Sequence, residues 1–160
     1  MPNDDDKILA HDLYQQIYAQ LKLNPRTIQW YATEGLLPKP TKIGTEAYYD
    51  DSAQIWARLQ VILILQKRHN QKLKEIKQII DKLKDADWES VLSFLQALQD
   101  TFPMTKVNQY GHELVNDKGW KIGGVIMRWL KEGRQPDAGW LTEAEEEAEK
   151  KPEHGDWEPF

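Results

Sequence analysis

Hydrophobic residues recur at helical spacing in several stretches of the chain, and each stretch ends at a local break. In residues 11–22, the side chains of Leu13, Ile17 and Leu21 fall on one side of a helix. Similar apolar faces predict helices over 53–67, 72–83, 87–100 and 120–132. The pattern therefore predicts a mainly α-helical fold.

A shorter helix is marked by the residues at its two ends. Asn24 is a favoured N-cap, and Pro25 suits the first helical position because its missing N–H would have no partner there. Gly35 supplies the left-handed residue that ends many helices. A helix is therefore predicted over about 25–34. It follows residues 11–22 after a short break, which is the arrangement of a helix-turn-helix.

Residues 36–49 are interpreted as a short two-stranded hairpin. The leucine pair at 36–37 and the run AYY at 47–49 flank a loop rich in proline, lysine and glycine, with Gly44 near its tip. A hairpin placed after a helix-turn-helix forms a wing. The predicted fold is therefore mainly α, a winged helix-turn-helix with a small β-hairpin wing, followed by additional C-terminal helices.

This order of elements predicts four regions. Residues 1–10 form an acidic N-terminal lead, and residues 11–84 form the winged helix-turn-helix domain. Residues 85–135 form a helical dimerisation or accessory region. From Pro136 onward acidic residues dominate, and residues 136–160 are expected to be an acidic, flexible tail.

Charge is distributed unevenly along the 160 residues, although the net charge is only -5. Residues 7–84 contain 13 Lys and Arg against 7 Asp and Glu, whereas residues 85–160 contain 8 against 16. A basic first half is compatible with nucleic-acid binding. The absence of cysteine excludes disulfides and thiolate metal sites. The sequence has no apolar run long enough to span a membrane, and its first residues, MPNDDDK, are unlike a signal peptide, so we expect a cytoplasmic location.

The helix at 25–34 presents groups suited to reading DNA. At about 100° per residue, Ile28, Tyr31 and Ala32 point to one side, while Arg26, Gln29, Trp30 and Thr33 point roughly to the other. A guanidinium and an amide are the groups that form paired hydrogen bonds with guanine and adenine in the major groove. Tyr31 lies at the boundary, where its hydroxyl could reach a phosphate. The alternative is an ordinary surface helix whose tryptophan packs under the hairpin.

The hairpin adds a basic arm that can reach flanking phosphates, although a solvated loop is the alternative. The candidate DNA-binding residues are Arg26, Thr27, Gln29, Trp30, Tyr31, Thr33, Lys39, Lys42, Tyr48 and Tyr49.

The run from Leu13 to Leu83 resembles the DNA-binding domain of the MerR family of transcriptional regulators. The resemblance lies in RTIQWYATEGLLPKP, GTEAYY, ARLQVILILQ and LKEIKQII, which follow one another in the family's order. It implies double-stranded DNA as the partner, a homodimer, and a role in transcription without catalysis.

Three departures from the family's pattern change what the resemblance implies. Gln29 stands where the family usually has arginine, and Trp30 replaces the first tyrosine of an aromatic pair. The base preference should therefore differ from the family's usual one. The wing's Gly-Tyr-Arg is replaced by GTEA at 44–47, and the turn before the last helix, often Gly-Phe-Ser, is RHNQ at 68–71.

Members of the family usually dimerise through a long helix, but the candidate helix at 87–100 is short. Its apolar residues are the candidate dimerisation set, Trp88, Val91, Leu92, Leu95 and Leu98. They could instead pack against 120–130, within a subunit or across a dimer. Four dispersed histidines and no cysteine indicate no metal site, and no motif indicates a cofactor or catalysis.

The sequence therefore predicts a sequence-specific, double-stranded DNA-binding transcriptional regulator. A dimeric repressor of an imperfect palindrome at a promoter is the favoured form. The alternatives are an activator that distorts promoter DNA, with RNA polymerase as a further partner, an excisionase-like architectural factor, and a protein-interaction module that docks through Trp30.

Overall fold

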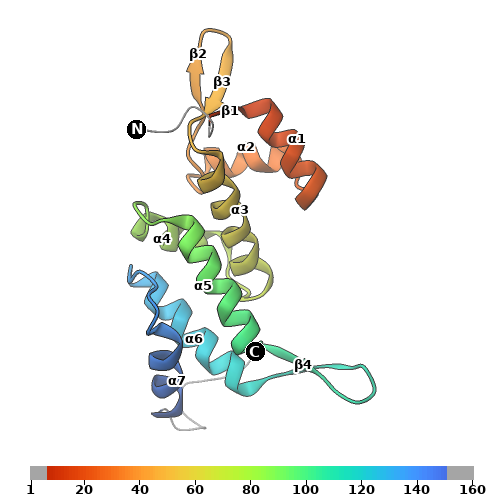
Figure 1. Cartoon of the computed structure of the whole chain (residues 1–160), viewed down its shortest axis with the longest axis vertical. Coiled ribbons are helices and arrows are strands. Elements are labelled where there is room, and N and C mark those ends of the chain that lie inside the picture. The colour runs from red at the N-terminus through yellow and green to blue at the C-terminus, as the bar shows by residue number, and fades with distance from the viewer. Residues whose placement is uncertain (1–6, 151–160) are drawn as a thin grey trace.

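The computed structural model describes residues 7–150, and its winged part and its C-terminal helices occupy opposite ends of an elongated molecule (Figure 1). The first end contains β1 (Ile8–Leu9), α1 (Ala10–Leu21), α2 (Pro25–Thr33), β2 (Thr41–Ile43) and β3 (Glu46–Tyr49). The middle contains α3 (Ser52–Lys67), α4 (Leu73–Lys82) and α5 (Trp88–Thr101). The other end contains β4 (Thr105–Val107), β5 (Glu113–Val115), α6 (Asp117–Lys131) and α7 (Trp140–Lys150). The mainly α fold with a hairpin wing and further C-terminal helices is confirmed.

The predicted local signals set the limits of α2. Asn24 Oδ1 accepts a hydrogen bond from the Arg26 backbone N–H at 2.9 Å, and Pro25 is the first helical residue. Gly35 has φ +83°, a conformation that favours glycine, and the next N–H, of Leu36, donates to the Tyr31 carbonyl at 2.8 Å. These contacts end the helix and turn the chain toward the wing.

The wing is a three-stranded antiparallel sheet in the order β1-β3-β2. Lys42 lies opposite Ala47 in the β2–β3 pair, and Ile8 lies opposite Tyr49 in the β1–β3 pair. The predicted acidic lead over 1–10 therefore includes a short strand and the start of α1. The leucines at 36–37 are not in a strand. They are buried at the base of the wing, where the Arg58 Nε–H donates to the Leu36 carbonyl at 2.7 Å.

The helices from α3 onward share one hydrophobic core with the winged part. α3 packs against α5, and Gln54 joins their N-terminal ends: its side chain donates to Asp87 Oδ1 at 2.8 Å and accepts from the Trp88 N–H at 2.8 Å. Figure 1 shows the β4–β5 hairpin, which was not predicted, extending away from the helices.

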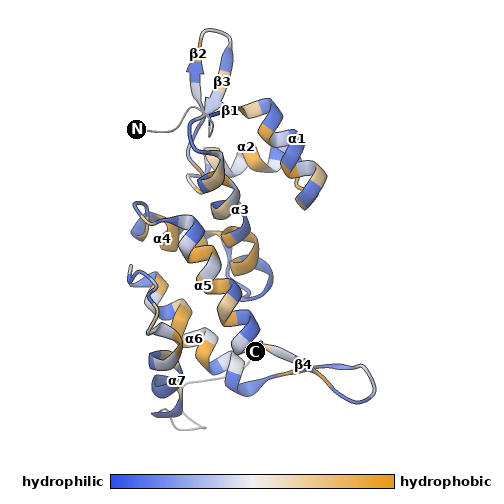
Figure 2. Ribbon diagram, viewed as in Figure 1, coloured by the Kyte–Doolittle hydropathy of each residue, from blue (hydrophilic) through white to orange (hydrophobic). Residues whose placement is uncertain are grey.

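The acidic segment after Pro136 contains a helix, and this corrects the prediction of a flexible tail over 136–160 for the part that the structure describes. Trp140 is fully buried, with its ring centroid 5.3 Å from that of Phe94 and 5.1 Å from that of Trp129. α7 looks mostly hydrophilic in Figure 2, but Ala144 and Ala148 continue its buried face. Residues 151–160 lie outside the described residues.

The charges of α7 are partly neutralised by α6 and the turn after it. Glu145 pairs with Lys118 at 2.5 Å, Glu147 with Arg128 at 3.5 Å and Glu143 with Arg134 at 2.6 Å. An acidic run that faces cations can form a helix, whereas the same run without partners would repel itself. The acidic residues and their partner cations lie on separate segments of the chain. The number of acidic residues after Pro136 therefore did not predict the helix.

Candidate nucleic-acid interface

α2 is held in place by the residues on its inner side. Ile28, Tyr31 and Ala32 are buried in the core cluster that also contains Leu13 and Ile17 of α1. Burying side chains of this size contributes on the order of 2 kcal/mol each, so the inner side fixes the orientation of the short helix. The outer side is consequently presented in one orientation.

The outer side of α2 carries the predicted reading groups. Arg26, Gln29, Trp30 and Thr33 are exposed, and 44% of Trp30 is accessible to solvent. The side chains of Arg26 and Gln29 make no hydrogen bond or ion pair with the described residues. Thr33 Oγ1 donates to the Gln29 carbonyl at 3.1 Å, and Thr27 is only partly exposed. A free guanidinium and a free amide therefore project from one rigid helix face.

The wing follows α2 in the sequence and carries exposed lysines. Lys39 and Lys42 are exposed, and neither forms an ion pair within residues 7–150. Ile43, beside Gly44 at the tip, is 55% exposed. Exposed apolar and basic residues at the tip of a hairpin suit the minor groove and the flanking phosphates.

Tyr48 is tied to its neighbours on the wing. Its hydroxyl donates to Glu46 Oε2 at 2.5 Å, and this hydrogen bond raises the pKa of Tyr48. Lys7 Nζ lies 5.1 Å from the centre of the Tyr48 ring. Lys7 was not predicted as part of the interface, because a two-residue strand gives no periodic signal. The strand β1 places this cation beside the wing.

Tyr31 and Tyr49 are not on the surface that the sequence predicted. Tyr31 is 4% exposed and Tyr49 is 3% exposed. The Tyr49 hydroxyl lies 3.2 Å from that of Tyr14, and burial followed by this hydrogen bond raises the pKa of Tyr49. Burial also raises the pKa of Tyr31. Both rings belong to the core, so they support the interface from below.

Most of the candidate dimerisation residues also lie inside the chain. Trp88, Val91, Leu95 and Leu98 are each at most 3% exposed, and Leu92 is partly exposed. The Trp88 ring lies under the Arg58 guanidinium at 5.3 Å, and α5 packs mainly against α3. These side chains therefore form the core of a single subunit.

No helix within residues 7–150 is long and apolar enough to cross a membrane. In the same residues, no group of three His, Cys, Asp or Glu side chains could hold a metal ion.

Comparison with known proteins agrees with this geometry. Residues 15–83 match the model of the MerR HTH family regulatory protein, a span that runs from α1 to the end of α4. Neither the curated proteins nor the solved structures gave a significant match. The matched span contains the capped α2 helix, its outer face and the whole β2–β3 pair. Residues 15–83 therefore form a regulatory domain of the MerR helix-turn-helix family, a non-enzymatic family of DNA-binding transcriptional regulators.

Proposed function

We propose that this regulator is a cytoplasmic homodimeric repressor that binds an imperfect palindrome at a promoter. The observation that carries the proposal is the outer face of α2, where Arg26 and Gln29 project without partners among the described residues. Unpaired groups on a rigid helix lose little on binding DNA, because no internal bond must break first. A protein that occupies a promoter can exclude RNA polymerase without any further activity, so repression is the simplest consequence of such a surface.

The roles of the residues divide by chemistry. Arg26 and Gln29 read base edges in the major groove, with Trp30 and Thr33 beside them. Lys39, Lys42 and Lys7 contact phosphates, which gives affinity without sequence preference. Because glutamine pairs best with adenine, we expect an adenine in each half-site at the position facing Gln29.

A selection from a random duplex library, followed by variants, tests these roles. Gln29→Ala is expected to lose about 1–3 kcal/mol of discrimination at one position per half-site. Lys42→Ala is expected to weaken all duplexes alike and to reduce the salt dependence of binding by about one ion. Gln96→Ala, an exposed glutamine on α5, is the matched control and should change neither property. Equal loss on every duplex for Gln29→Ala would contradict its role as a base reader.

The dimer requires its own test. The buried α5 residues leave little surface there, and the β4–β5 hairpin exposes Val107, Tyr110 and Leu114 instead. Sedimentation at micromolar concentration should give a dimer. A monomer that still protects two half-sites in a footprint would remove the dimer from the proposal without affecting the DNA-binding roles.

The site of binding in the genome separates repression from the alternatives. A footprint that overlaps a promoter, with transcription lowered in vitro, is the expected result. Raised transcription from the same site would favour activation by DNA distortion, in which RNA polymerase stays bound. Sites at the ends of mobile elements would favour an architectural factor.

A further inference from the structure

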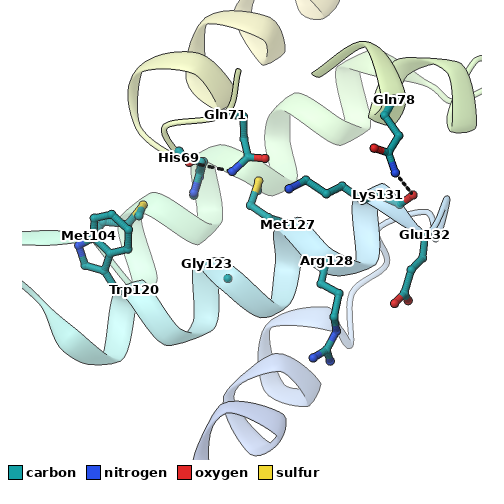
Figure 3. Close-up of a pocket in the computed structure, with 11 residues that line it drawn as sticks. His69, Gln71, Gln78, Met104, Trp120, Gly123, Met127, Arg128, Lys131 and Glu132 are labelled. Atoms are coloured by element: carbon teal, nitrogen blue, oxygen red, sulfur yellow. Dashed lines mark hydrogen bonds between the residues drawn. The ribbon is translucent and has the colours of Figure 1, made fainter. Parts of the chain in front are cut away.

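Trp30 differs from the other tryptophans of residues 7–150, because a large part of its side chain is open to solvent. The others are buried or partly buried: Trp56, Trp88, Trp120, Trp129 and Trp140. Figure 3 shows one of them, Trp120, on α6, where it lines the same cavity as Met104. Trp30 is instead 44% exposed. A single exposed apolar side chain is common on protein surfaces, so its position decides what it means.

Trp30 lies in the middle of the outer face of α2. It follows Arg26 by four residues and precedes Thr33 by three, and both spacings place side chains on the same side of a helix. Gln29 is its direct neighbour, and all four side chains are exposed. If Arg26 and Gln29 face base edges in the major groove, as the proposed function states, the indole ring enters the groove with them.

The ring of Trp30 rests beside a buried ring. Its centroid lies 5.7 Å from that of Tyr31, with an angle of 45° between the two planes. Tyr31 is 4% exposed and belongs to the core cluster. Contact with an immobile neighbour restricts the tryptophan, so less side-chain freedom is lost when it binds. The remaining surface of the indole is therefore an apolar group held at a defined place among the polar groups of α2.

Thymine is the one standard base that presents an apolar group in the major groove, its 5-methyl group. The other atoms that identify the bases there are hydrogen-bond donors and acceptors, whereas indole has a single N–H donor and no acceptor. Cytosine lacks the methyl group, but 5-methylcytosine carries it on the same ring carbon. An apolar ring among polar reading groups therefore fits thymine or 5-methylcytosine.

We propose that Trp30 packs against the 5-methyl group of a pyrimidine in each half-site, and that the protein consequently distinguishes 5-methylcytosine from cytosine there. The inference rests on the proposed entry of α2 into the major groove. Consecutive Cα atoms are about 3.8 Å apart and base pairs are about 3.4 Å apart, so the pyrimidine lies within about two base pairs of the adenine that faces Gln29. A contact between the indole N–H and a phosphate would instead give no preference among bases.

Duplexes that differ by single methyl groups test the contact with the full chain. In the half-site selected from a random library, each thymine is replaced in turn by deoxyuridine, which pairs with adenine in the same way and lacks only the methyl group. One replacement per half-site, within about two base pairs of that adenine, should weaken binding about fourfold, as expected for one buried methyl group. The proposal is overturned if no thymine lies there, or if its replacement changes the affinity by less than about twofold.

Cytosine methylation gives an independent measurement at the same position. Replacing the sensitive T·A pair by C·G should weaken binding, and methylation of that cytosine at carbon 5 should increase the affinity again by about fourfold. The two C·G duplexes differ only in the methyl group. Equal affinity for cytosine and 5-methylcytosine would therefore contradict the proposal.

Two variants assign the effect to Trp30. Trp30→Ala should bind the thymine and deoxyuridine duplexes equally, because the surface that covers the methyl group is gone. Gln29→Ala, the control at the neighbouring position, should lower the affinity for both duplexes and keep their ratio at about fourfold. Thermal unfolding confirms that each variant folds. If the ratio persists in Trp30→Ala, the methyl group acts through DNA shape or another side chain, and the assignment is wrong.

The outcomes separate this inference from the proposed function. An operator that Arg26 and Gln29 read, but that is insensitive to deoxyuridine, removes only the role of Trp30. If no sequence is selected from the library, the base-reading role of α2 is lost, and this inference is lost with it.

Discussion

Acid should destabilise this protein specifically through His69. The side chain is 7% exposed, and burial together with Arg68 lowers its pKa from 6.5 to about 4. The fold therefore favours the neutral ring, whereas the unfolded chain takes up a proton near pH 6.5. The contribution of the neutral ring to stability is complete above pH 6.5 and is lost as the pH falls from 6.5 through about 4.

The size of the effect follows from the two pKa values. The interval between 6.5 and about 4 corresponds to about 3 kcal/mol of unfolding free energy, nearly all of which is lost between pH 7 and pH 4. A domain of this kind has a total stability of roughly 5–15 kcal/mol, so one histidine would account for a large share of its acid sensitivity.

Urea unfolding at several pH values, on the unchanged chain and on His69→Gln, measures this loss. Glutamine is neutral throughout, and the carboxylates that titrate in the same interval are common to both proteins. The unchanged chain should therefore lose about 3 kcal/mol more than the variant between pH 7 and pH 4, whatever the variant costs at pH 7. Parallel curves for the two proteins, or an imidazole that titrates near pH 6.5 by NMR, would refute the reasoning.

Two further predictions concern stability measured by urea unfolding at neutral pH. Trp140→Ala should lower the free energy of unfolding by about 3–5 kcal/mol, because the fully buried ring contacts Phe94 and Trp129. The control Glu146→Ala, on the exposed side of α7, should change it little. A small effect of Trp140→Ala would mean that α7 is not part of the core. Asn24→Ala should cost about 1 kcal/mol and Asn24→Asp almost nothing, because only alanine removes the oxygen that accepts from the Arg26 N–H. Equal losses for the two Asn24 variants would show that the cap does not stabilise α2.

Local signals were sufficient to predict the helix-turn-helix and the presence of a hairpin after it, but they placed the first strand of the hairpin at the leucines 36–37, whereas the strand is Thr41–Ile43. Asn24, Pro25 and Gly35 mark α2 by rules that act over a few residues, and the structure confirms each of them. The strand at Ile8–Leu9 could not be predicted in this way. It is defined only by pairing with Tyr48 and Tyr49, some 40 residues later in the chain, and two residues show no alternation.

The tyrosines of the predicted interface show a second limit of sequence reasoning. A helical period separates two faces, but Tyr31 lies near their boundary, and only the packing of α1 and α2 decides on which side the ring falls. Tyr49 ends a strand, where its hydroxyl finds Tyr14 of α1. For α7, the acid run concealed an apolar spacing of four residues from Trp140 to Ala144 and Ala148. In each case the deciding contact comes from a segment that is distant in sequence.

The burial of these aromatic rings changes how the recognition surface should be understood. Tyr49 connects the wing to α1, Leu36 connects the base of the wing to Arg58 of α3, and Tyr31 connects α2 to the same core. The exposed groups of α2 and the wing therefore rest on a common support, and their spacing is fixed before DNA binds. Because the supporting rings and the proposed base-reading groups are different residues, the proposed function predicts that substitution of Gln29 or Trp30 changes base preference without loss of the fold. Substitution of a supporting ring would instead reduce binding to every sequence, since it displaces both reading elements together.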